Sequence, residues 1–103
     1  MTSAHQQSIS QFIKELDSEQ LPIKKIYLYG SYSRGEEHEW SDIDLGVVTE
    51  PFAEDSFAET VHLQKIAHRI NPILSPVSLR PEDMDNRFCS LAQTIQREGQ
   101  LIE

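Results

Sequence analysis

The stretch from Ile26 to Val48, IYLYGSYSRGEEHEWSDIDLGVV, constrains this chain more than any other. An apolar, β-rich run ends at Gly30, a polar loop follows, and a second apolar run opens with Asp42-x-Asp44. Because side chains alternate across a strand, we expect both aspartates to point to the same face. Neighbouring carboxylates repel each other unless water or a cation neutralises them. Their hard oxygen atoms favour Mg²⁺, which usually leaves room for substrate phosphates.

Gly30 and Ser31 are expected to supply the second half of the site. Glycine lets the backbone approach a ligand closely, and Ser31 offers a hydroxyl and a backbone N–H. A short helix from Ser31 to Gly35 would aim N–H groups at a phosphate. Arg34 is placed to pair with a triphosphate, or else with a nearby acid of the loop: Glu36, Glu37 or Glu39. A phosphate cradle beside two carboxylates indicates a site for a magnesium-bound nucleoside triphosphate.

Gly30-Ser31, followed eleven residues after the serine by Asp42-x-Asp44, resembles the signature of the DNA polymerase β-like nucleotidyltransferases. The sequence context is most similar to the minimal nucleotidyltransferase branch, whose members are often antitoxins of HEPN-domain ribonuclease toxins. The resemblance implies transfer of AMP from ATP to a hydroxyl, in this setting one on the toxin. It also implies that Asp42 and Asp44 are catalytic Mg²⁺ ligands, and that Gly30 and Ser31, with help from Arg34, bind the nucleotide.

The chain departs from that family at one position. The resemblance implies a third acid on the next core strand, yet no acid occurs from Asn71 to Arg80, and Ser75 takes the expected place. Serine is a poor ligand for Mg²⁺ and a poor base. Two main alternatives stay open: an enzyme that is slow or is completed by its partner, and an impaired antitoxin that blocks its toxin by occlusion. Modification of a small molecule such as an antibiotic is a third.

The composition limits the class of partner. A chain of 103 residues is expected to form a single domain, 1–103, with residues 1–7 flexible. Its net charge of −8 argues against a long nucleic acid and favours a small nucleotide or a basic protein partner. No apolar run approaches the ~20 residues of a membrane span, and no signal segment is evident. We therefore expect a cytoplasmic protein, and leave a homo-oligomer open.

Hydrophobic spacing predicts an α/β (α+β) fold with two layers, a small mixed sheet and helices mainly on one face. Helices are predicted from Ser8 to about Leu16, at 56–70 and at 81–98, and strands at 23–29, 42–48 and 73–79, with a short extended tail at 100–103. Pro76 places the third strand at or near an edge of the sheet. Tyr27 and Tyr29 are expected to share one face of the first strand, either toward a ligand or in ordinary packing. This order agrees with the polymerase β-like nucleotidyltransferase fold that the resemblance implies.

Overall fold

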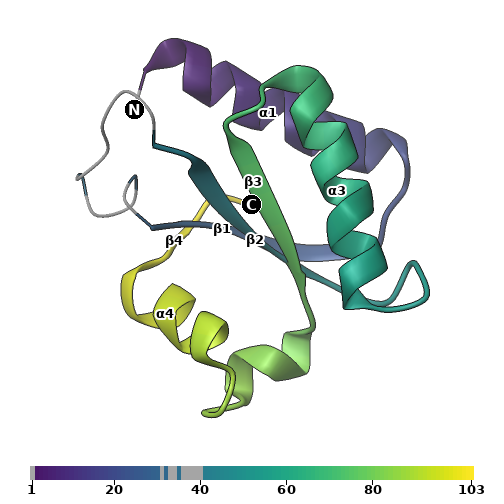
Figure 1. Cartoon of the computed structure of the whole chain (residues 1–103), viewed down its shortest axis with the longest axis vertical. Coiled ribbons are helices and arrows are strands. Elements are labelled where there is room, and N and C mark those ends of the chain that lie inside the picture. Colours follow the sequence, from purple (N-terminus) through teal and green to yellow (C-terminus); the bar gives the residue numbers. More distant parts are fainter. Residues whose placement is uncertain (1, 31, 33–34, 36–40) are drawn as a thin grey trace.

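The computed structural model describes residues 2–30, 32, 35 and 41–103 (Figure 1). Its elements are α1 (Ser3–Ser18), β1 (Ile23–Tyr29), β2 (Ile43–Thr49), α3 (Ser56–Ile70), β3 (Leu74–Leu79), the 3₁₀ helix η1 (Pro81–Asp85), α4 (Ser90–Glu98) and β4 (Gln100–Leu101). Among the candidate site residues, Ser31 and Arg34 lie outside the described residues. Within the described residues, every helix is too short or too polar to span a lipid bilayer.

The sheet is mixed, as predicted, and its strands lie in the order β3-β2-β1-β4. β1 pairs antiparallel with β2 and with β4, whereas β2 and β3 are parallel. β3 is an edge strand, which confirms the expectation drawn from Pro76. The predicted tail forms β4 at the opposite edge, where its residues Gln100 and Leu101 pair with Leu28 and Tyr27.

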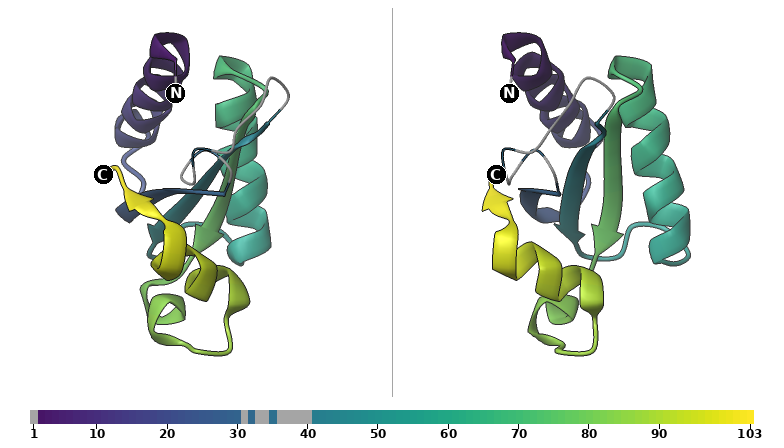
Figure 2. Two further views of the ribbon diagram at one scale, coloured as in Figure 1. Left: turned by 90° about the vertical axis from the view of Figure 1, so that its left-hand side faces the viewer. Right: turned by 60° about the vertical axis from the view of Figure 1, so that its left-hand side comes forward.

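Two groups of apolar side chains cover the two faces of the sheet. On one face α1 and α3 pack on β1, β2 and β3, and the fully buried members include Phe12, Leu45 and Leu63. On the other face a smaller cluster forms around Val48, Leu79 and Ile95, the last from α4. Figure 2 shows α4 well apart from α1 and α3. The helices therefore lie mainly on one face, and α4 covers only part of the other.

Helix α1 begins at Ser3, five residues before the predicted start. The side chain of Thr2 caps it by accepting a hydrogen bond from the backbone N–H of His5 at 3.2 Å. The first turns are mostly exposed, so they carry no apolar periodicity that could have revealed them. Residues 3–7, which we expected to be flexible, are thus helical.

The predicted helix over 81–98 is interrupted. It forms η1 and α4, separated by residues 86–89. The side chain of Asn86 accepts a hydrogen bond from the Phe88 N–H at 2.9 Å, a local turn that competes with helix formation. The continuous helix was predicted from an apolar stripe at helical spacing, formed by Met84, Phe88, Leu91 and Ile95. Phe88 of this stripe is 82% exposed, while Ile95 is fully buried. Cys89, at the N-cap of α4, is partly buried.

Candidate functional site

Three residues from three strands lie in one row across the sheet. Asp44 of β2 is registered with Tyr29 of β1 on one side and with Ser75 of β3 on the other. Registered side chains on neighbouring strands share a face. This is the face that carries α4, because Gly46, two residues after Asp44, lies against the side chain of Ile95.

Helix α4 covers this face at one end only. A Cβ built on Gly46 would come within 2.7 Å of the Ile95 side chain, so only glycine allows the helix to approach this closely. Asp44 lies toward the start of β2 and is partly buried. Within the row, Tyr29 packs against the cluster around Ile95, whereas Asp44 and Ser75 are only partly buried.

Gly30 brings the glycine turn directly onto Asp44. Its φ of +78° is a conformation that favours glycine. A Cβ at this position would collide with the Asp44 carboxylate. The two halves of the sequence motif are thus in van der Waals contact through Gly30 and Asp44.

Asp42 lies one residue before β2 and is exposed. Ile43 and Leu45 are fully buried in the main core, so the alternation on which the prediction depended is present at the start of β2. In the described residues no three His, Cys, Asp or Glu side chains gather into a metal-binding group. The oxygen donors of Asp42 and Asp44 fit Mg²⁺ by their chemistry, and the register puts the hydroxyl residue Ser75, not an acid, beside Asp44.

Tyr29 borders the site; the sequence predicted that it lies on a face either toward a ligand or in ordinary packing, but assigned it no role. Burial, and then the negative charge of Asp44, raise the pKa of the Tyr29 phenol from 10.0 to about 12. The phenol therefore stays protonated beside the carboxylate. Its place immediately before Gly30 in the motif is the sequence signal that could have identified it.

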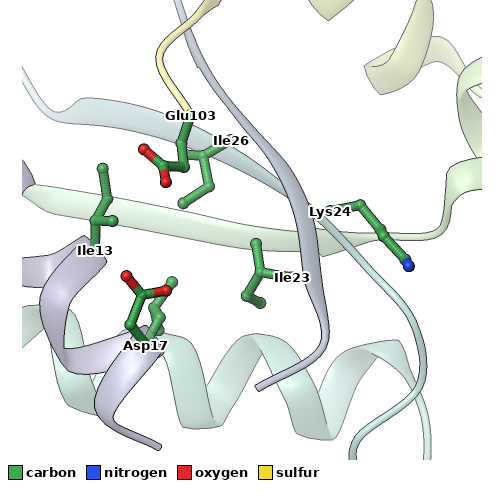
Figure 3. A pocket seen from close by; sticks show the side chains of 7 residues that line it. Ile13, Asp17, Ile23, Lys24, Ile26 and Glu103 are labelled. Carbon is green, nitrogen blue, oxygen red and sulfur yellow. The ribbon is translucent and has the colours of Figure 1, made fainter. Parts of the chain in front are cut away.

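A cavity elsewhere in the chain is a poor place for a triphosphate. It has a volume of about 140 Å³ and lies between α1, β1 and the C-terminal residue, on the main-core face (Figure 3). Asp17 and Glu103 flank it with carboxylates, while Lys24 points away from the other labelled side chains. This volume is well below the roughly 300 Å³ at which ligand pockets begin, so the row at Asp44 remains the better candidate.

The sequence model of one family, described as nucleotidyltransferase domain, matches residues 9–102. The chain belongs to the nucleotidyltransferase domain family. The mixed sheet and the order of elements are consistent with the polymerase β-like nucleotidyltransferase fold.

Solved toxin–antitoxin structures are similar to this nucleotidyltransferase domain. One, a toxin–antitoxin with AMP-PNP, is 24% identical with a TM-score of 0.63, over 97% of this chain and 72% of that chain. An MntA-HpeT toxin–antitoxin mutant is 26% identical with a TM-score of 0.62, over 91% of this chain and 70% of that chain. The MntA-HepT toxin–antitoxin is 22% identical with a TM-score of 0.58, over 93% of this chain and 69% of that chain. No curated protein matched the chain.

Proposed function

We propose that this nucleotidyltransferase domain binds Mg-ATP and transfers AMP to a hydroxyl group of a toxin protein. The observation that carries the proposal is the contact between Gly30 and the Asp44 carboxylate. It joins a turn suited to phosphate with an acid suited to a metal, across two antiparallel strands.

Each residue of the motif has a role in this proposal. Asp42 and Asp44 hold Mg²⁺, which when bound neutralises charge on the triphosphate. Gly30 lets a phosphate lie close to the backbone, and Ser31 and Arg34, which lie outside the described residues, bind the phosphates as the motif implies. The acceptor oxygen attacks the α-phosphorus and pyrophosphate leaves.

The step that we expect to be slow at this site is removal of the proton from the acceptor hydroxyl. The residue registered beside Asp44 is Ser75, and a serine hydroxyl does not accept a proton at neutral pH. We therefore expect slow turnover, or turnover completed by a basic group from the partner. The same observation supports a second function, in which the domain neutralises its toxin by binding alone.

The proposed partner is a HEPN-domain toxin with a basic surface. Several of the similar structures are toxin–antitoxin proteins, one of them solved with AMP-PNP. The net charge of −8 favours association with a basic protein. An acidic surface of this kind gives no support to a long nucleic acid as the acceptor.

The decisive experiment incubates the purified domain and its toxin with Mg²⁺ and ATP labelled in the α-phosphate. We expect label on the toxin, and its loss in the double variant Asp42→Asn with Asp44→Asn. A double control, Glu54→Gln with Asp85→Asn, removes the same charge at two exposed positions and should retain transfer. Label transfer that survives in the Asp42/Asp44 variant would exclude the proposed chemistry.

The same variants separate transfer from occlusion. If the Asp42/Asp44 variant binds the toxin but no longer protects cells, the chemistry is required for neutralisation. If it still protects cells, binding alone suffices. In the first case, Ser75→Asp should accelerate transfer, because it places a third carboxylate in the row beside Asp44.

A further inference from the structure

Tyr32, two residues after Gly30, contacts His5 of α1. It follows Ser31 directly in the sequence, is partly buried and packs against the main core. Its hydroxyl oxygen lies 3.5 Å from Nδ1 of His5, and either group can donate, according to the histidine tautomer. The two rings meet edge to face, with centroids 5.7 Å apart and planes at 82°. Such an arrangement is favourable for aromatic rings.

His5 lies in the part of the chain that the family model does not cover. The match begins at residue 9, whereas His5 is in the first turn of α1. The backbone N–H of His5 is held by the side chain of Thr2, which caps the helix. The contact with Tyr32 therefore joins a helix start of this chain to the turn that carries the family motif.

Packing by the described residues does not confine the Tyr32 ring on all sides. A cavity of about 420 Å³ borders it, lined by residues of α1, β1 and the C-terminal tail: Gln6, Ile9, Ser10, Ile13, Leu28, Tyr32, Gln100 and Ile102. A side chain that borders a cavity lacks close contacts in that direction. The contact with His5 is thus an important restraint on the position of the ring.

We propose that Tyr32 and His5 are positioning residues, which hold the chain at Tyr32, two residues after Gly30, against α1 and so increase the affinity for the triphosphate. The inference rests on the proposed nucleotide site at Gly30 and Asp44. Neither residue is required to touch the nucleotide. Their effect comes from restricting the turn before binding, which reduces the ordering that binding would otherwise require.

Binding of AMP-PNP in the presence of Mg²⁺, measured by calorimetry, tests this directly. Tyr32→Phe loses only the hydrogen bond and should weaken binding about two- to fivefold. His5→Ala loses the hydrogen bond and the ring contact and should weaken it about five- to tenfold. Tyr32→Ala loses both contacts and its packing on the main core, and should weaken binding about tenfold or more. In a His5→Ala background, Tyr32→Phe should have little further effect, because its partner is already absent. His68→Ala, at an exposed position on α3, is the matched control.

Hydrogen exchange of the backbone amides, measured without nucleotide, is a second test of the positioning role. The backbone amides of Gly30, Tyr32 and Gly35 should exchange faster in His5→Ala and Tyr32→Ala, while those of α3 keep their wild-type rates. A merely structural role would instead accelerate exchange throughout the main core.

The outcomes separate this inference from the function on which it rests. Wild-type affinity and wild-type exchange in both variants would overturn the positioning role while leaving the nucleotide site intact. A wild-type chain that binds no AMP-PNP, or whose binding is unaffected by Asp44→Asn, would overturn the nucleotide site and the positioning role with it.

Discussion

At Gly30 the backbone adopts a φ of +78°, and a Cβ would enter the space of the Asp44 carboxylate. Gly35 has a similar φ of +70°, but no atom of the described residues lies within 4 Å of its Cβ position. The two glycines thus share one conformational constraint and differ in a steric one. This difference makes them a matched pair for the candidate site.

Gly35→Ala should lower the free energy of unfolding by roughly 1–2 kcal/mol, the cost of a side chain in the left-handed region. Gly30→Ala should lower it by about 1–3 kcal/mol more, because the added methyl group also displaces Asp44. Chemical denaturation monitored by circular dichroism measures both values. Equal effects of the two variants would show that the contact with Asp44 has no energetic consequence.

Among the elements, the end of β3 and the start of α3 are joined by a buried ion pair. Glu59 of α3 is fully buried and accepts two hydrogen bonds from Arg80, at 2.6 and 2.8 Å. It also accepts from the Ser78 hydroxyl at 2.8 Å and from the backbone N–H groups of Phe52 and Ala53 at 2.9 and 3.3 Å. Every oxygen of this buried carboxylate is thereby satisfied, which is the condition for burying a charge.

The Glu59 carboxylate makes the free energy of unfolding depend on pH. Burial by itself would raise the pKa of Glu59, but the hydrogen bonds from Arg80, Phe52, Ser78 and Ala53 outweigh it and lower the pKa from 4.5 to about 2. The unfolded chain therefore binds the proton first as the pH falls. The stabilisation by Glu59 is present above pH 4.5 and is lost as the pH falls from about 4.5 to 2.

Glu59→Gln should lower the free energy of unfolding at neutral pH by about 3–5 kcal/mol, because Arg80 is left without its charged partner. The variant should also lose less further stability than the wild type between pH 4.5 and 2. Urea denaturation at several pH values measures both effects, with the exposed Glu54→Gln as control. A parallel loss of stability with acid in the variant and the wild type would contradict the role of Glu59.

The break between η1 and α4 can be tested by two substitutions on the stripe that predicted a single helix. Phe88→Ala should change stability by no more than about 0.5 kcal/mol, since the ring is 82% exposed. Ile95→Ala should cost about 2–5 kcal/mol, because the side chain is fully buried against the sheet. Thermal denaturation compares them. A large loss for Phe88→Ala would instead support the continuous helix.

For the whole molecule, the two edges of the sheet differ. At β3, Pro76 has no N–H to offer, the Ser78 N–H donates to the Thr60 hydroxyl at 2.9 Å, and the Gln64 amide donates to the Pro76 carbonyl at 3.5 Å. Helix α3 thus occupies the hydrogen-bonding groups along this edge, which discourages pairing with another strand. β4 at the opposite edge has only two residues, and Leu101 is 55% exposed.

The net charge of −8 also belongs to the whole chain. If a basic toxin is the partner, its association rate should fall steeply as salt is raised, since ions screen the steering field. The dissociation rate should change much less. Biolayer interferometry over a series of salt concentrations measures both. An association rate independent of salt would argue that net charge has no part in partner recognition.

The sequence by itself determined the strands and the family motif. β1 was predicted with its observed bounds, and α3 and the edge position of β3 were predicted correctly. These features depend on local periodicity and on single residues such as Pro76, which act wherever the chain folds. The prediction that Gly30, Ser31 and Arg34 bind a nucleotide, and Asp42 and Asp44 a metal, stays a prediction for the experiments above.

Only the tertiary structure decided how distant residues meet. The start of α1 and the break before α4 depend on the hydrogen bonds of Thr2 and Asn86, which the apolar pattern does not record. The row of Tyr29, Asp44 and Ser75 depends on strand register, and the contact of His5 with Tyr32 spans 27 residues. Register and long-range packing are set by the balance of many contacts at once, so no local stretch of sequence specifies them.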